Sequence, residues 1–137
     1  LHYPLRRQRQ MCIRDRPEPL ATAIATTHQG VTQNAQFTQA MIWERYPWPL
    51  SRERLLAGNA PSMAMQAQPA SRLAQRETGE QGVLFSKTGS TNGFAGYAAF
   101  VPDERIGVVM LANRNVPLEA RVDASYKLLQ QVLEAER

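Results

Sequence analysis

The stretch VLFSKTGSTNGFAGYAAFVPDERIGVVMLA, from Val83 to Ala112, decides the fold. It contains three runs that are rich in β-forming side chains: Val83 to Ser90, Phe94 to Val101 and Ile106 to Ala112. Two short polar connections, Thr91-Asn92-Gly93 and Pro102 to Arg105, separate these runs. Because short connections of this kind join antiparallel neighbours, we expect three consecutive strands of one antiparallel sheet.

A long helix is expected after this stretch, from Pro117 to Ala135. Proline is tolerated in the first turn of a helix. Apolar or small residues then recur at helical spacing: Leu118, Val122, Ser125, Leu129 and Val132. One helix face should therefore pack on the sheet. The order strand, strand, strand, helix predicts an α+β fold, an antiparallel sheet flanked by helices on one side.

Weaker patterns precede residue 83. We expect a helix from Pro17 to His28, with Leu20 and Ile24 on one face and Gly30 as its stop. A strand is expected from Phe37 to Tyr46, because that run is rich in β-forming side chains and ends in a Pro-Trp-Pro turn.

The connection between these elements and residue 83 is predicted to be mostly irregular. A short helix from Ser51 to Ala57 has Ser51 as its N-cap and Glu53 in its first turn. Asn59 to Arg72 holds two prolines and no period, which indicates an extended surface loop. Arg76 to Gln81 is polar and favours a turn or a hairpin tip.

The net charge of +4 is confined to the first sixteen residues. Residues 1–16 contain five arginines and one aspartate, whereas the remaining 121 residues contain eleven basic and eleven acidic side chains. A basic face on the folded domain is therefore not expected, which argues against nucleic-acid binding. We interpret residues 1–16 as an extension outside the domain, disordered or artefactual, and residues 17–137 as the domain.

Other classes of protein are excluded by composition. The single cysteine, Cys12, allows no disulfide framework and no multi-cysteine metal site, and His2 and His28 are too far apart to suggest zinc. No apolar run approaches the roughly 20 residues of a membrane-spanning helix. The first sixteen residues also lack the apolar stretch of a signal peptide.

Lys87-Thr88-Gly89-Ser90 is the segment that suggests chemistry. At a strand end, Lys87 would place a positive charge beside an anion, and the Thr88 hydroxyl could donate to a carboxylate. Gly89 has no Cβ, so a ligand can approach the backbone. The Ser90 N–H could face a developing oxyanion. Together these groups suit acyl transfer on a substrate that carries a carboxylate, although the tripeptide alone is more often just a strand end.

A longer pattern makes the chain resemble the class C serine β-lactamases over residues 17–137. The segments that carry the resemblance, in family order, are THQG (27–30), FTQAMIWERYPWPL (37–50), LLAGN (55–59), KTGSTNGF (87–94) and LANRN (111–115). The resemblance implies the C-terminal part of the fold that serine β-lactamases share with penicillin-binding transpeptidases. It implies no cofactor, no metal, and a parent protein that is periplasmic and monomeric.

The resemblance also implies roles for individual residues. Lys87 would act electrostatically on the nucleophile and the Ser90 N–H would be part of the oxyanion hole. Thr88, Gly89, Thr91, Asn115 and Arg121 would bind a β-lactam or a D-Ala-D-Ala-like substrate. Leu118 stands where many relatives have an asparagine, which removes one polar contact. Without the resemblance, Arg121 would be read as a solvated helix residue and Asn115 as a cap.

Two motifs of the family are absent from these 137 residues. No serine is followed three places later by lysine, so S-x-x-K is missing, and none of the four tyrosines begins Y-x-N. A serine nucleophile needs an adjacent base. We therefore expect no hydrolysis of β-lactams by this chain alone. Open strand edges and exposed apolar faces should also make it poorly soluble.

Three alternatives remain open at this point. The first is a related D-alanyl-D-alanine carboxypeptidase or β-lactamase-like esterase, although the STNGF and LANRN segments favour class C. The second is a non-catalytic remnant. The third is a basic nucleic-acid binder, which rests on residues 1–16 alone.

Overall fold

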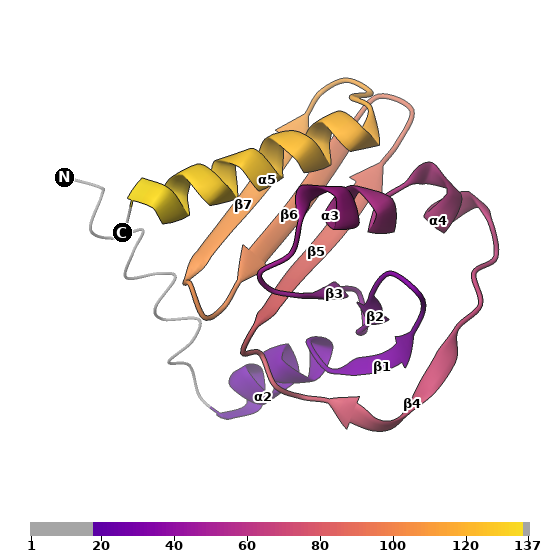
Figure 1. Cartoon of the computed structure of the whole chain (residues 1–137), viewed down its shortest axis with the longest axis vertical. Helices are drawn as coiled ribbons and strands as arrows, with labels where there is room; N and C mark the ends of the chain where they lie inside the picture. Colours follow the sequence, from indigo (N-terminus) through magenta and orange to yellow (C-terminus); the bar gives the residue numbers. More distant parts are fainter. Residues whose placement is uncertain (1–17, 136–137) are drawn as a thin grey trace.

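The computed structural model describes residues 18–135, and the prediction made for residues 1–16 lies outside them. The helices are α2 (Glu18–Thr27), α3 (Arg52–Gly58), α4 (Pro61–Met65) and α5 (Leu118–Ala135). The strands are β1 (Gly30–Gln33), β2 (Thr38–Gln39), β3 (Glu44–Pro47), β4 (Ser71–Glu77), β5 (Val83–Ser90), β6 (Ala95–Val101) and β7 (Ile106–Ala112). Figure 1 shows their arrangement.

Within the described residues, the strands form one seven-stranded sheet in the order β4-β1-β2-β3-β5-β6-β7. Every neighbouring pair is antiparallel. The three strands expected from the stretch 83–112 form consecutive neighbours, with Ser90 opposite Ala95 and Val101 opposite Ile106. The prediction of an α+β fold built on an antiparallel sheet is therefore confirmed.

The core lies between one face of the sheet and two helices. Alternate residues of β6 are buried, because successive side chains of a strand point to opposite faces. The buried ones are Ala95, Tyr97, Ala99 and Val101. The last three of these pack with Leu55 of α3 and with Val122 and Leu129 of α5. Helix α5 thus packs on the sheet as its spacing predicted.

The buried face of α5 is rotated slightly from the predicted one. Val122, Ser125 and Leu129 are buried as expected, but Val132 is 43% exposed and Leu133 is buried in its place. The predicted positions repeat every 3.5 residues on average, whereas the helix has 3.6 residues per turn, so the contact of the last turn falls on Leu133 instead of Val132.

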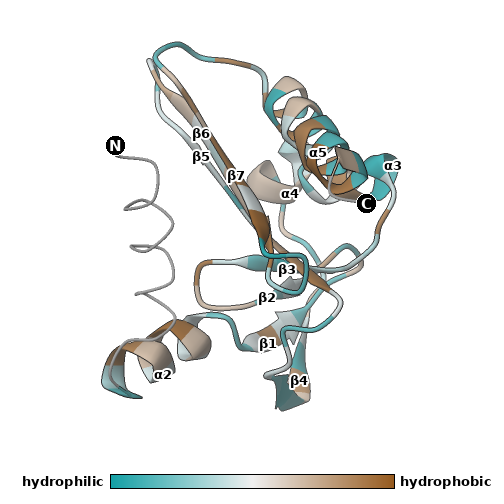
Figure 2. Ribbon diagram, turned by 90° about the vertical axis from the view of Figure 1, so that its left-hand side faces the viewer, coloured by the Kyte–Doolittle hydropathy of each residue, from teal (hydrophilic) through white to brown (hydrophobic). Residues whose placement is uncertain are grey.

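The prediction that the helices share one side of the sheet is wrong. Helices α3 and α5 lie on one side of β5–β7, whereas α2 lies on the other (Figure 2). On the α2 side, His28 follows the helix and packs on Phe85 and Phe100, with ring centroids 4.7 and 5.4 Å away. Aromatic side chains on this face are stabilised when they are shielded from water, and His28, which follows α2, shields Phe85 and Phe100.

The strand expected from Phe37 to Tyr46 is two short strands joined by a tight turn. The Ala40 N–H donates to the Trp43 carbonyl oxygen at 2.8 Å, and β2 then pairs with β3. Met41 and Ile42 lie at the turn and are 65% and 52% exposed. Their β-forming side chains made the turn look like part of a continuous strand.

Three further elements were not predicted. Strand β1 pairs with β4 at the edge of the sheet, and α4 lies within the segment expected to be an irregular loop, 59–72. Strand β4 also takes in Arg76 and Glu77, which were expected in a turn. Its side chains are nearly all exposed, so the sequence shows no alternation of apolar and polar residues. Helix α3 begins as predicted, since the Ser51 side chain accepts from the Arg54 N–H.

Candidate functional site

Strand β5 has β3 as a neighbour for only the first half of its length. Strand β3 runs beside it from Val83 to Ser86, whereas β6 continues beside it to Ser90. In the part of the chain that the structure describes, Lys87 to Ser90 therefore form an open strand edge. The four residues of the predicted K-T-G-S segment all lie on this edge.

The turn after β5 fixes the direction of the backbone groups on this edge. The Thr91 N–H donates across the hairpin to the Phe94 carbonyl oxygen at 2.9 Å. In an antiparallel pair, successive residues direct their N–H groups alternately toward and away from the partner strand. The Ser90 N–H, one residue earlier, therefore points away from β6 and toward the open edge. This is the direction that an oxyanion-binding N–H requires.

The side chains on the edge are accessible. Lys87 has 47% of its side chain exposed, and Thr88 is half-buried. A Cβ added to Gly89 would meet nothing within 4 Å, so the backbone at this position borders open space. The edge thus presents an ammonium group, a hydroxyl group and a free backbone N–H within four consecutive residues.

Glu44 is a site residue that the sequence analysis missed. Its carboxylate lies 3.8 Å from the Lys87 ammonium and has only 13% of its side chain exposed. The Tyr46 hydroxyl donates to it at 3.4 Å and the Ser86 hydroxyl at 3.5 Å. Burial raises the pKa of Glu44, although the Lys87 charge and the two hydroxyl donors oppose that rise.

The signal for Glu44 in the sequence was slight. An acidic residue in the aromatic-rich run IWERYPW is unusual, but 42 residues separate Glu44 from Ser86, its partner in the sheet. Only the register of β3 against β5 brings the carboxylate to Lys87. Strand β3 begins at Glu44, opposite Ser86, so this residue marks the point on β5 where the open edge begins.

Arg121 reaches the same edge from α5. It is 3% exposed, and one of its terminal nitrogens donates to the carbonyl oxygens of Gly89 and Gly96, both at 2.7 Å. The other terminal nitrogen donates to the Ser90 hydroxyl at 2.8 Å. The structure therefore brings Arg121 to the K-T-G-S segment, with its guanidinium group bound to the protein.

Thr91 and Asn115 lie near this edge but on exposed connections. Thr91 begins the β5–β6 turn, and with Phe94, Gly96 and Leu111 it borders a hollow at the end of the hairpin. Asn115 lies in the exposed segment between β7 and α5. Leu118 packs against the core cluster, so an apolar side chain at this position contributes to packing.

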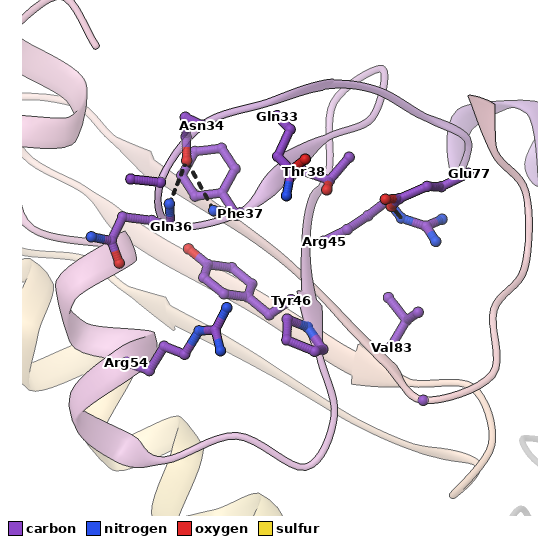
Figure 3. A pocket seen from close by; sticks show the side chains of 13 residues that line it. Gln33, Asn34, Gln36, Phe37, Thr38, Arg45, Tyr46, Arg54, Glu77 and Val83 are labelled. Carbon is purple, nitrogen blue, oxygen red and sulfur yellow. Dashed lines mark hydrogen bonds and ion pairs between the residues drawn. The ribbon is translucent and has the colours of Figure 1, made fainter. Parts of the chain in front are cut away.

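A second hollow of about 300 Å³ lies at the opposite end of β5 (Figure 3). Its polar groups are largely bound to one another. Asn34 accepts from the N–H groups of Gln36 and Phe37, and Arg45 lies 3.4 Å from Glu77 while donating to two backbone carbonyl oxygens. The Asn34 contacts hold the β1–β2 connection in place, and the Arg45 contacts join β3 to the segments at His28 and Gly79.

Residues 18–135 contain no group of three or more His, Cys, Asp or Glu side chains that could hold a metal ion. Of the helices described, none is both long and apolar enough to cross a membrane.

Comparison with known proteins gives consistent results. The family model described as Beta-lactamase matches residues 13–133. A β-lactamase of Providencia stuartii is 44% identical over 110 residues, which are 80% of this chain and 29% of that protein. A β-lactamase of Pseudomonas fluorescens is 41% identical over 112 residues, 82% of this chain and 31% of that protein. The chain thus spans about a third of the length of these curated relatives.

Solved structures match equally well. The class C β-lactamase of Rhodobacter sphaeroides has a TM-score of 0.79 and 50% identity, covering 85% of this chain and 33% of that one. The D-alanine carboxypeptidase AmpC of Burkholderia cenocepacia has a TM-score of 0.82 and 48% identity, covering 84% of this chain and 33% of that one. The expected fold is therefore confirmed, and so is the expected resemblance to the class C type.

Proposed function

The chain belongs to the β-lactamase family, and from this premise we propose that it provides one wall of a serine hydrolase site that opens β-lactam antibiotics, cephalosporins among them. The nucleophilic serine and its base would come from parts of the family fold outside these 137 residues. The proposal is limited to one wall because the chain matches about a third of each relative.

The open edge of β5 is the observation that carries the proposal. A β-lactam carries a carboxylate beside a strained amide carbonyl. Thr88 can donate to the carboxylate, and the positive charge of Lys87 lies one residue away. The Ser90 N–H can bind the carbonyl oxygen as it becomes an oxyanion, because donors fixed in advance stabilise developing charge.

The reaction would proceed through an acyl-enzyme. The serine hydroxyl oxygen bonds to the lactam carbonyl carbon, its proton goes to the base, and the oxyanion forms beside Ser90. The carbon–nitrogen bond of the ring then breaks and the ring nitrogen takes up a proton. Water hydrolyses the ester in a second addition. Lys87, Thr88 and Ser90 bind and orient in both halves of the reaction, and none is the nucleophile.

The 137-residue chain by itself should show no turnover of a chromogenic cephalosporin, since it contains neither S-x-x-K nor Y-x-N. A purified chain that hydrolysed the substrate above the buffer rate would refute this expectation. The parent protein would act in the periplasm as a monomer, which follows from the resemblance alone.

The decisive experiment is a chimera. The matching 110-residue segment of the Providencia stuartii β-lactamase would be replaced by that of this chain. We expect the chimera to hydrolyse a cephalosporin, and K87A to lower kcat/KM by about 10²- to 10³-fold. A matched control is K127A, because the Lys127 side chain is 63% exposed on α5. A folded chimera without activity would overturn the proposal.

A D-alanyl-D-alanine carboxypeptidase is the second candidate. The D-alanine carboxypeptidase AmpC of Burkholderia cenocepacia is 48% identical to this chain. A β-lactam and a D-Ala-D-Ala peptide both present a carboxylate beside the scissile amide. The same chimera distinguishes the two activities. Faster release of D-alanine from a D-Ala-D-Ala peptide than opening of a cephalosporin would favour the carboxypeptidase.

A further inference from the structure

Arg121 is bound to a single structural unit, the last paired residues of the β5–β6 hairpin. Its three hydrogen bonds go to Gly89, Gly96 and Ser90, at 2.7, 2.7 and 2.8 Å. Gly89 and Gly96 lie directly opposite each other in the sheet. Among residues 18–135, no carboxylate lies within 4.0 Å of this buried guanidinium group. Its positive charge is therefore directed at backbone carbonyl oxygens.

A pair of facing glycines is a weak point in a sheet. Glycine loses more conformational freedom on folding than other residues and contributes no side chain to cross-strand packing. At a hairpin end with an open edge on one side, few other contacts hold the strand. A guanidinium group that spans both carbonyl oxygens fixes the pair from the α5 side.

The peptide group between Gly89 and Ser90 links Arg121 to the open edge of β5. Its carbonyl oxygen accepts from Arg121, and its N–H is the one that points to the open edge. A planar trans peptide directs these two groups in opposite directions. A cation bound at the oxygen draws electron density from the nitrogen, and hydrogen bonds linked in this way strengthen one another. The Ser90 N–H becomes a stronger donor as a result.

We propose that Arg121 is a positioning residue that fixes the Gly89–Ser90 peptide and polarises its N–H toward the open edge. The inference deepens the proposed function and rests on it, because the N–H matters only if an oxyanion forms there. It also departs from the substrate-binding role that the resemblance implies. A substrate carboxylate would have to compete with three short protein hydrogen bonds in a buried place.

Amide hydrogen exchange in the 137-residue chain tests the first half of the proposal without any substrate. Base-catalysed exchange of an exposed N–H slows when its acidity falls, so R121Q should slow exchange at Ser90 by at least about twofold. The same variant should speed exchange at Thr91, whose N–H is bonded across the hairpin. R121K keeps the positive charge but lacks the planar fork of donors that spans both carbonyl oxygens. The exchange rate at Ser90 should therefore recover more than the rate at Thr91.

Arg45 provides the matched control. It is 5% exposed and also donates to two backbone carbonyl oxygens, at His28 and Gly79, away from the open edge. R45Q should leave the ratio of the Ser90 and Thr91 rates unchanged. If R121Q does not fold, S90A removes one of the three bonds and should shift Thr91 alone. Ser90 exchange that is unchanged or faster in both R121Q and R121K would overturn the proposal.

Kinetics of the chimera test the second half. R121Q should lower kcat by on the order of tenfold, less than the loss of an oxyanion donor itself. The factor should be similar for a cephalosporin and for its uncharged methyl ester, with little change in KM. A loss confined to KM of the carboxylate-bearing substrate would make Arg121 a substrate ligand and overturn the proposal. If the chimera is inactive, the proposed function fails, and the exchange measurement still decides the role of Arg121 in the hairpin.

Discussion

Glycine has opposite consequences at two positions of this chain. A Cβ added at Gly89 would meet open space, whereas one added at Gly58 would overlap the ring of Tyr46. Glycine at 58 is thus required by packing. At 89 the packing of the protein does not require it, which agrees with the proposed approach of a ligand to this edge.

We therefore predict that G89A and G58A separate stability from activity. G89A should introduce no strain and should change the free energy of unfolding by less than about 1 kcal/mol. It should lower kcat/KM of the chimera, because a methyl group enters the space of the ligand. G58A should destabilise by about 1–3 kcal/mol through overpacking. Urea denaturation and cephalosporin assays measure the two effects, and an active G89A chimera would contradict the prediction.

Glu44 gives the site a pH dependence whose sign can be stated. Burial raises its pKa in the folded chain. A carboxyl group with a raised folded pKa contributes stability that is complete below its unfolded pKa and is lost as the pH rises through the folded value. Glutamine does not titrate, so the urea midpoint of E44Q should rise relative to that of the unaltered chain as the pH increases from about 4 to about 8. E53Q, at a 76% exposed side chain, is the control. If the urea midpoints of E44Q and of the unaltered chain depend on pH in the same way, burial of Glu44 does not have this effect.

At the scale of elements, α5 holds the sheet through a narrow line of side chains. Leu129 is 2% exposed and belongs to the core cluster, whereas Val132, three residues later, is 43% exposed. L129A should cost about 2–5 kcal/mol of unfolding free energy, as buried leucines do. V132A should cost less than about 1 kcal/mol. If urea denaturation shows equal losses for L129A and V132A, Val132 belongs to the buried face of α5, as its spacing predicted.

Several of the predicted elements show a contrast between one buried and one open face, as strands β6 and β7 and helix α5 do. The first half of β5 is buried on both faces and was predicted from its run of β-forming side chains. The K-T-G-S segment is contiguous, so its place at a strand end could be predicted directly. Strand β4 is exposed on both faces and shows no pattern. Glu44 and the hydrogen bonds of Arg121 depend on strand register and on helix docking, which bring together residues that are far apart in sequence.

At the scale of the whole molecule, the sheet has an apolar surface on the side away from α5. Val109 and Leu111 of β7 are 71% and 83% exposed, and Phe94 in the adjoining turn is 64% exposed. The alternate residues of the same strand, Val108 and Met110, point toward the core side, as alternation in a strand requires. Large exposed apolar side chains that lie together favour association.

We predict that the 137-residue chain self-associates through this surface. The double variant V109T/L111T should bind less of a hydrophobic dye and elute as a smaller species in size-exclusion chromatography. Threonine is β-branched, a shape that strands favour, so the unfolding midpoint should change little. V108T, on the core side of the same strand, is the matched control, because it should lower the midpoint without reducing association. If the double variant associates as strongly as the unaltered chain, the open edge of β5 becomes the surface responsible, since an unpaired strand edge also recruits partners.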